Sequence, residues 1–173
     1  SGLMVLARTE AAASELSRQI RDGEFHKEYL AVLHGIPAEK EALLRDLLLR
    51  DKRERKTYVV HQPGKDVQEA ILHYRLLRRT QTMSRVHIRL QTGRTHQIRV
   101  HMSSIGHPLL GDGVYGGGNT RFEAEHRALI TGQCLHAGKL RLIHPATGER
   151  MTFEAPMPGE MQKLLDILRR EAQ

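Results

Sequence analysis

The residues with the clearest chemical potential lie between positions 91 and 108, where the sequence reads Q-T-G-R-T-H-Q-I-R-V-H-M-S-S-I-G-H-P. Gly93 permits a tight turn out of a preceding strand, and Thr95 can cap a helix that starts at His96. Free backbone N–H groups and the helix dipole converge at such a start, so the segment predicts an anion-binding site with Arg99 on the flank of the helix. An ordinary connection that carries a half-exposed arginine explains the same residues equally well.

An apolar face must hold this helix against the rest of the domain. Ile98, Met102 and Ile105 recur at helical spacing, so we expect them to meet the core. Gly106 is placed to end the helix, and Pro108 prevents its continuation. The segment is therefore predicted to be a short helix that keeps its arginine close to the body of the domain.

The positive charge of the chain is concentrated around the same segment. The sequence has 27 Lys and Arg against 20 Asp and Glu, a net charge of +7, which makes a polyanion the favoured class of partner. No acidic residue occurs between positions 75 and 111, whereas arginine, whose planar fork suits phosphate, recurs there. These arginines are Arg75, Arg78, Arg79, Arg85, Arg89, Arg94 and Arg99. Their segregation favours an anion-binding surface over an undirected basic face.

A second basic run occupies residues 50–56 and contains interspersed acids. We interpret it as a mobile loop or a solvated helix end, with RNA contact as the less favoured reading.

Composition excludes several other classes of protein. The 173 residues suit a single globular domain over 1–173, and the longest apolar run, at positions 3–7, is far shorter than the roughly 20 residues that cross a bilayer. No secretion signal is recognisable, and the single Cys134 rules out a disulfide framework. His96 and His101 do not have metal-ligand spacing. We therefore expect a cytoplasmic protein with no metal and no membrane association, and a monomer by default.

Hydrophobic periodicity predicts the elements that surround the chemical segment. Strands are expected at Leu3–Arg8, Lys27–His34, Gln68–Leu77, Ser84–Leu90, Cys134–Ile143 and Arg150–Ala155, and helices at Glu10–Arg21 and Glu160–Arg170. Residues 42–50 fit a helix and a strand equally well. The expected fold is an α+β domain with a mixed, largely antiparallel sheet and flanking helices.

Four stretches of the sequence resemble the RluA family of pseudouridine synthases. T-G-R-T-H-Q-I-R-V-H at 92–101, followed by G-H-P-L-L-G-D at 106–112, is similar to the family's long and highly specific signature. K-E-Y-L-A-V at 27–32 resembles its K-x-Y-x-A-x strand, and L-H-A at 135–137 with H-P-A-T-G-E at 144–149 resembles its ending. The opening S-G-L resembles the tail of its H-R-L-D-x-x-T-S-G-L motif.

This resemblance implies an enzyme that converts uridine in RNA to pseudouridine without a cofactor or metal. Ribosomal RNA of the large subunit is the favoured substrate, and transfer RNA is the other substrate class of the family. By position, Arg99 corresponds to the arginine that pairs with the family's catalytic aspartate, Tyr29 to the tyrosine beside the flipped base, and Leu135 to an apolar residue of the pocket. Further candidates for substrate binding are Arg89, Arg94, His96 and Gln97.

The catalytic aspartate itself departs from the family pattern, because the motif places it four positions before the residue that is Ser1 here. We interpret the sequence as lacking the N-terminal part of the catalytic domain, with a strand supplied from elsewhere as the alternative. The 173 residues are therefore expected to be inactive as they stand. Asp112 lies in the G-H-P-L-L-G-D loop, where a turn-stabilising or RNA-proximal role is expected.

Two other functions compete with this interpretation. A non-catalytic RNA-binding or ribosome-associated module would need the basic residues but neither Tyr29 nor Arg99. A small-molecule enzyme with a phosphate-bearing substrate would need a cofactor fingerprint, which the sequence does not contain.

Overall fold

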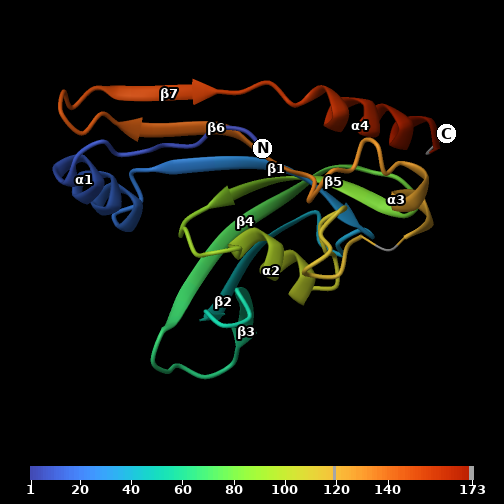
Figure 1. The fold of residues 1–173 in the computed structure, drawn as a ribbon, viewed down its shortest axis with the longest axis horizontal. Coiled ribbons are helices and arrows are strands. Elements are labelled where there is room, and N and C mark those ends of the chain that lie inside the picture. The colour runs from blue at the N-terminus through green and yellow to red at the C-terminus, as the bar shows by residue number, and fades with distance from the viewer. Residues whose placement is uncertain (119, 172–173) are drawn as a thin grey trace.

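The computed structural model describes residues 1–118 and 120–171, which form a seven-stranded sheet flanked by four helices (Figure 1). The strand order is β3-β2-β4-β5-β1-β6-β7. The strands are β1 (His26–His34), β2 (Glu41–Asp51), β3 (Lys56–Val60), β4 (Val67–Arg79), β5 (Met83–Leu90), β6 (Leu135–Ile143) and β7 (Arg150–Glu154). The helices are α1 (Glu10–Arg21), α2 (Gln97–Ser104), α3 (Arg121–Glu125) and α4 (Gly159–Glu171).

The sheet confirms the expected α+β fold. Neighbouring strands pair in antiparallel fashion throughout the described chain, and the parallel contact is an isolated bridge between Gly2 and Ala137. The undecided residues 42–50 belong to strand β2, which pairs with both β3 and β4. The basic run at 50–56 is therefore the end of β2 and the turn into β3, and the suggestion of a helix end was wrong.

The strand expected at Leu3–Arg8 does not form. The segment keeps Leu3 and Val5 against a small core cluster, whereas Met4 and Leu6 are each 79% exposed. Strand β7 pairs with β6 from Lys139 onward, so the N-terminal segment finds only the short edge at 135–137 open for pairing. An alternating apolar pattern predicts a strand, but it does not show whether a partner edge is available.

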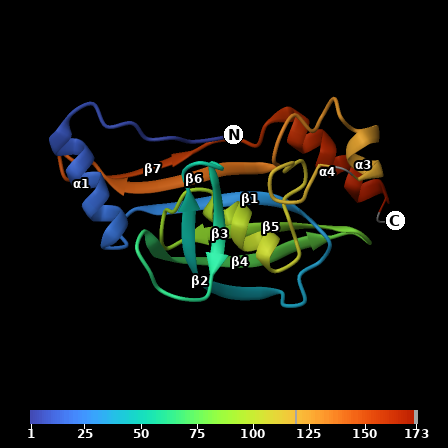
Figure 2. The ribbon, with the colours of Figure 1, turned by 60° about the horizontal axis from the view of Figure 1, so that its bottom comes forward.

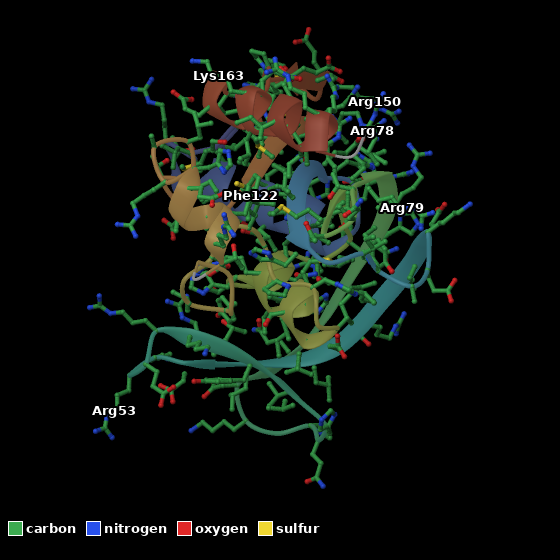
Figure 3. All side chains as sticks on the ribbon, turned by 90° about the vertical axis from the view of Figure 1, so that its right-hand side faces the viewer. Arg53, Arg78, Arg79, Phe122, Arg150 and Lys163 are labelled. Atoms are coloured by element: carbon green, nitrogen blue, oxygen red, sulfur yellow. The ribbon has the colours of Figure 1, made fainter. Side chains whose placement is uncertain are left out.

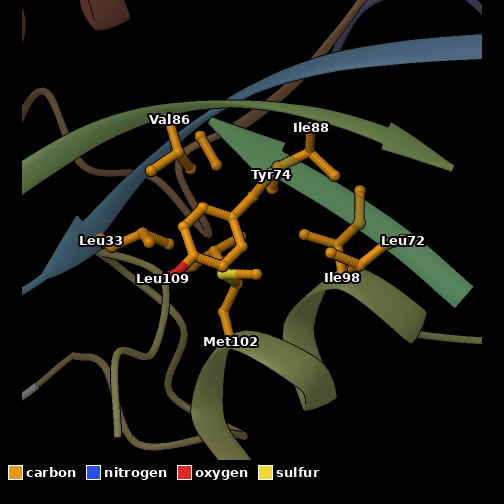
Figure 4. Close-up of a cluster of buried hydrophobic side chains, with 9 residues drawn as sticks. Leu33, Leu72, Tyr74, Val86, Ile88, Ile98, Met102 and Leu109 are labelled. Carbon is orange, nitrogen blue, oxygen red and sulfur yellow. The ribbon is translucent and has the colours of Figure 1, made fainter. Parts of the chain in front are cut away.

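The two faces of the sheet carry different helices. On one face, here called the α2 face, α2 covers a core cluster from β1, β4 and β5 (Figures 2 and 4). Ile98 and Met102 lie in that cluster and Ile105 packs against it, as the helical spacing predicted. On the opposite α4 face, Leu164, Leu165 and Leu168 pack against Val32 and Met83. Helices α1 and α4 lie at opposite ends of the molecule (Figure 1).

A single carboxylate organises the loop that connects α2 to β6. Glu123, at 5% exposure, accepts hydrogen bonds from the backbone N–H groups of Gly111, Gly118 and Thr120, and its Oε1 lies 3.1 Å from His34 Nε2. Burial alone would raise the pKa of Glu123, but these donors favour the charged form and lower the pKa to about 2. The loop is thus fastened to β1 through an ionised side chain.

Replacing Glu123 with an uncharged residue should remove the part of the pH dependence of stability that this carboxylate causes. Because the folded-state pKa is depressed, the contribution of Glu123 is complete above pH 4.5 and is lost as the pH falls towards 2. We expect Glu123→Gln to lower the free energy of unfolding by about 3 kcal/mol at pH 7, and the deficit to shrink between pH 5 and 3. Urea unfolding across that pH range measures the deficit. Glu125→Gln, on the exposed side of the same helix, is the control and should change stability by less than about 0.5 kcal/mol; a pH-independent deficit for Glu123→Gln would contradict the assignment.

Candidate active site

Tyr29 and Leu135 lie close together on the α2 face. Strand β1 pairs with β6 so that Tyr29 is opposite Ala137 and Ala31 is opposite Leu135. Tyr29 and Leu135 are both half-buried and pack against the core cluster that α2 covers. Burial raises the pKa of the Tyr29 hydroxyl, so the phenol is protonated at neutral pH and can donate a hydrogen bond. The pair offers an aromatic ring, a hydroxyl and an apolar wall.

The first residues of the chain are clamped onto β6 at this point. The nitrogen of Ser1 donates to the carbonyl of Leu135 at 3.0 Å, and the Ser1 carbonyl accepts from the N–H of Ala137 at 2.9 Å. The Ser1 hydroxyl lies 3.1 Å from Nδ1 of His136, whose Nε2 lies 3.1 Å from the carbonyl of Ala155. The clamp therefore uses both the backbone and the buried imidazole of β6.

Gly2 makes this close approach possible. Its φ is +100°, a conformation that L side chains rarely adopt, and a Cβ built on it would collide with the Ala137 carbonyl. The glycine of the S-G-L stretch thus has a physical reason, which sequence inspection alone did not supply.

Arg99 forms a two-pronged ion pair with Asp112. Nε and Nη2 of Arg99 donate to the two carboxylate oxygens at 2.6 and 2.7 Å, and the two side chains are 12% and 0% exposed. Asp112 also accepts from the N–H groups of Val114 and Tyr115. Burial by itself would raise the pKa of Asp112, but the guanidinium and these N–H groups hold the pKa below its usual range.

This ion pair differs from the pairing of Arg99 that the sequence suggested. The resemblance reserved Arg99 for a carboxylate outside the 173 residues, whereas the structure provides Asp112 as a partner within the chain. The turn-stabilising role expected for Asp112 is confirmed by its bonds to the backbone. Within the described residues Nη1 of Arg99 has no hydrogen-bond partner, and the guanidinium lies over the ring of Tyr115 at 4.9 Å. Arg99 therefore retains donors for a second anion.

The start of α2 is built differently from the expected cap. His96 occupies the N-cap position in a left-handed conformation, with no side-chain cap, so the prediction that Thr95 caps the helix was wrong. The Thr95 hydroxyl instead accepts from Arg50 at 2.8 Å, because the β2–β3 hairpin folds over this turn. His96 Nδ1 lies 3.0 Å from the Tyr115 hydroxyl. Burial, together with Arg99 and Arg50, lowers the pKa of His96, which favours the neutral imidazole.

The side chain of Gln97 stabilises the turn that precedes α2. Its Oε1 accepts from the N–H of Arg94 and the hydroxyl of Thr92, and its Nε2 donates to the carbonyl of Ile71. The residue is only 2% exposed. The structure thus places Gln97 in the scaffold and not on a surface that a substrate could reach.

Arg94 lies in a small basic pocket with the β2–β3 hairpin. Arg50, Lys52 and Arg94, together with one carboxylate, Asp66, line a cavity of about 190 Å³ beside Thr95. Nε of Arg94 donates to the carbonyl of Glu69. The second basic run thus reaches the start of α2 through the fold, although the two segments are some 40 residues apart in sequence. The excess of positive charge in this pocket lies beside the turn for which the sequence predicted an anion-binding site.

The arginines between positions 75 and 99 do not form one surface. Alternation along β5 turns Val86 and Ile88 to the α2 face and Arg85 and Arg89 to the opposite face. Arg89 lines a cavity of about 740 Å³ next to the end of α1, on the face away from Tyr29. Arg89 therefore does not share a site with Tyr29, in contrast to its grouping by sequence position.

Two further features are absent among the described residues: a cluster of metal ligands and a helix that could span a membrane. Across 1–118 and 120–171 no three His, Cys, Asp or Glu side chains converge as a metal site would require. No helix in these ranges has both the length and the hydropathy to span a bilayer.

Comparison with known proteins identifies the family. The RNA pseudouridylate synthase family model matches residues 1–104. The chain belongs to this family. Among individual pseudouridine synthases, the chain is 38% identical to "Ribosomal large subunit pseudouridine synthase D" of Escherichia coli (strain K12) over 175 residues, covering 98% of this chain and 52% of that protein. It is 39% identical to "Uncharacterized RNA pseudouridine synthase YlyB" of Bacillus subtilis (strain 168), covering 98% and 53%. The chain thus spans about half the length of the curated relatives it matches.

Solved pseudouridine synthase structures share the fold. "Human RNA Pseudouridylate Synthase Domain Containing 4" superposes with a TM-score of 0.75 at 23% identity, over 96% of this chain and 70% of that chain. "Human RNA Pseudouridylate Synthase Domain Containing 1" gives a TM-score of 0.68 at 25% identity, over 94% and 73%. The antiparallel sheet with its flanking helices is therefore the fold of pseudouridine synthases.

The clamp at the N-terminus predicts a specific effect of Gly2→Ala. The added methyl group should push residues 1–3 away from β6, because the Cβ would meet the Ala137 carbonyl. We expect hydrogen exchange at the amides of Leu3 and Ala137 to accelerate at least about tenfold, while the rest of the sheet keeps its protection. Gly159→Ala, where a Cβ would meet nothing within 4 Å, is the matched control. Unchanged protection at both amides would contradict this account of Gly2.

The ion pair of Arg99 predicts a large stability effect of Asp112→Asn. Removing the carboxylate leaves a largely buried guanidinium without its counter-charge, so we expect a loss of about 3 kcal/mol in the free energy of unfolding. Chemical denaturation at pH 7 measures this loss. Asp166→Asn, which removes an exposed ion pair with Arg169, should cost less than about 1 kcal/mol. Similar small losses in both variants would show that the Arg99 pair contributes little.

Proposed function

We propose that this chain is a catalytic domain without its N-terminal part, and that the complete domain converts uridine in RNA to pseudouridine, with large-subunit ribosomal RNA as the substrate. The supporting observation is the clamp of Ser1 on Leu135, one strand away from Tyr29. In the family's motif the catalytic aspartate precedes this serine by four positions. Four residues span at most about 14 Å, so the aspartate would emerge within reach of Tyr29 and Leu135.

The chemistry requires a pocket that holds a detached base. The base leaves the sugar through nitrogen and returns through carbon, so that carbon must lose a proton and the nitrogen must gain one. Leu135 supplies an apolar wall, and the ring of Tyr29 supplies a face on which the base can stack. The protonated Tyr29 hydroxyl can hydrogen-bond to the base or take part in moving the proton.

Arg99 has a double role in this proposal. Its Nε and Nη2 tie α2 to the loop of Asp112, and its Nη1 can donate to the carboxylate of the aspartate. The nearby positive charge would keep that carboxylate ionised and ready to act at the nucleotide. Asp112 acts as a positioning residue, because it fixes the plane of the guanidinium.

The RNA backbone would be held beside the pocket. Arg50, Lys52 and Arg94 form the basic pocket at the start of α2, where a phosphate can be neutralised. His96 is neutral there and can accept or donate a hydrogen bond.

A non-catalytic RNA-binding module is the second candidate. One observation favours it for the 173 residues: the charge of Arg99 is already matched by Asp112. A binder would depend on the basic pocket but would have no use for the Tyr29 hydroxyl.

An activity assay distinguishes the enzyme from the RNA-binding module. It uses a chain extended upstream through H-R-L-D-x-x-T. We expect this extended chain to form pseudouridine in ribosomal RNA, residues 1–173 alone to form none, and Tyr29→Phe in the extended chain to lower kcat by about 100-fold. Arg99→Lys should lower it similarly, because lysine cannot bridge two carboxylates in one plane. Pseudouridine is quantified by mass spectrometry of digested RNA.

Two controls show whether a loss of turnover comes from the catalytic step and not from impaired folding or RNA binding. Tyr74→Phe, which removes a hydroxyl from the same sheet face at the core, should leave turnover within about threefold. RNA affinity of the Tyr29→Phe variant should also stay within about threefold of the parent. Full turnover by Tyr29→Phe, or by residues 1–173 alone, would refute the proposed site.

A further inference from the structure

A second cavity lies on the α4 face, at the end of the sheet remote from α1. It has a volume of about 360 Å³ and lies between the β4–β5 turn and α4. Val32, Met83, Leu165 and Leu168 form an apolar floor, and four arginines, Arg78, Arg79, Arg85 and Arg169, line the remainder. We call it the arginine pocket. Figure 3 shows Arg78 and Arg79 at this end of the molecule, near α4.

The arginine pocket has an excess of positive charge. Among the described residues that line it there is no carboxylate, and of its four arginines Arg169 pairs with Asp166 on the half-exposed surface of α4 at 2.9 Å. Arg78, Arg85 and Arg169 line the same cavity, and burial together with the charges of Arg169 and Arg78 lowers the pKa of Arg85. Such crowding of like charge costs free energy unless an anion binds among them.

One buried donor in the pocket lacks a partner. Nε of Arg85 is buried without a hydrogen bond within the described chain. Unpaired buried polar groups are rare in native structures, because each loses its bonds to water on folding. A tetrahedral oxyanion could accept hydrogen bonds from Nε of Arg85 and from the neighbouring guanidinium groups.

We propose that the arginine pocket binds a phosphate group of RNA, on the face of the sheet opposite to Tyr29. The apolar floor suits the attached ribose or base, and the volume lies in the range of small-ligand sites. Arg78 and Arg79 are exposed and extend the positive charge outward from the cavity, which favours a polymer of phosphates over an isolated one. The choice of RNA as the source rests on the proposed function, whereas the phosphate chemistry does not.

Direct observation of Arg85 tests the pocket. Residues 1–173 labelled with ¹⁵N are titrated with inorganic phosphate, with uridine monophosphate and with an oligouridylate, and the Nε–Hε signal of Arg85 is followed by NMR. We expect all three to shift this signal, the oligouridylate at a concentration at least about tenfold lower than the others because several phosphates contribute. A signal that shifts with none of them overturns the proposal. A shift with the two small anions alone overturns RNA as the source.

Charge-matched variants supply an independent measurement. Arg85→Gln combined with Arg169→Gln should weaken oligouridylate binding about three- to tenfold and reduce the slope of log K against log salt by about 1 to 2. Arg8→Gln combined with Arg150→Gln removes the same charge from exposed positions and should weaken binding by less than about twofold. Equal losses in the two pairs would overturn the proposal. Arg169→Gln alone, at a half-exposed side chain, gives the test if the double variant unfolds.

Failure of this proposal can be told apart from failure of the proposed function. Tyr29→Phe in the extended chain lies on the other face and should leave the Arg85 titration unchanged. If pseudouridine forms but Arg85 does not respond, the arginine pocket alone is refuted. If Arg85 responds but no pseudouridine forms, the anion site stands without the enzyme.

Discussion

The ion pair between Arg99 and Asp112 joins α2 to the loop that follows it, and the arrangement of the α2 face depends on this link. Both side chains are largely withdrawn from water, so each charge needs the other. Asp112 in turn holds the backbone at Val114 and Tyr115, and the hydroxyl of Tyr115 reaches the backbone of Thr57 in the β2–β3 hairpin. A charge pair thus connects helix α2, the loop that follows it and the β2–β3 hairpin.

The other boundary of the site is set by the edge of β6. Strand β7 leaves residues 135–137 free, and the first residues of the chain occupy that short edge because Gly2 allows the backbones to meet. The same contact that ends the sheet brings Ser1 to Leu135. Local edge geometry therefore connects the beginning of the chain to the wall of the candidate pocket.

The sheet separates two groups of positively charged side chains. Arg94 and the hairpin residues lie at the start of α2, whereas Arg85 and Arg89 point to the opposite face because strand residues alternate. The residues that match the family model include Tyr29 and Arg99 on the α2 face, and also Arg78, Arg79 and Arg85 of the arginine pocket. The pocket itself forms where the β4–β5 turn meets α4.

The sequence alone determined the family, the α+β class and most elements, because these depend on local periodicity and on contiguous motifs. Helix α1 with its Thr9 cap, strand β1 and the β6–β7 hairpin follow from residues adjacent in the chain. Tertiary structure decided what depends on distant partners: the strand state of residues 42–50, the failure of Leu3–Arg8 to pair, and the structural role of Gln97. It also decided that Arg99 meets Asp112, since the two residues are separated by twelve others and only the folded loop brings them into contact. Secondary-structure propensity depends on residues that are neighbours in the sequence. The pairing of a buried charge depends on tertiary packing, which removes both partners from water.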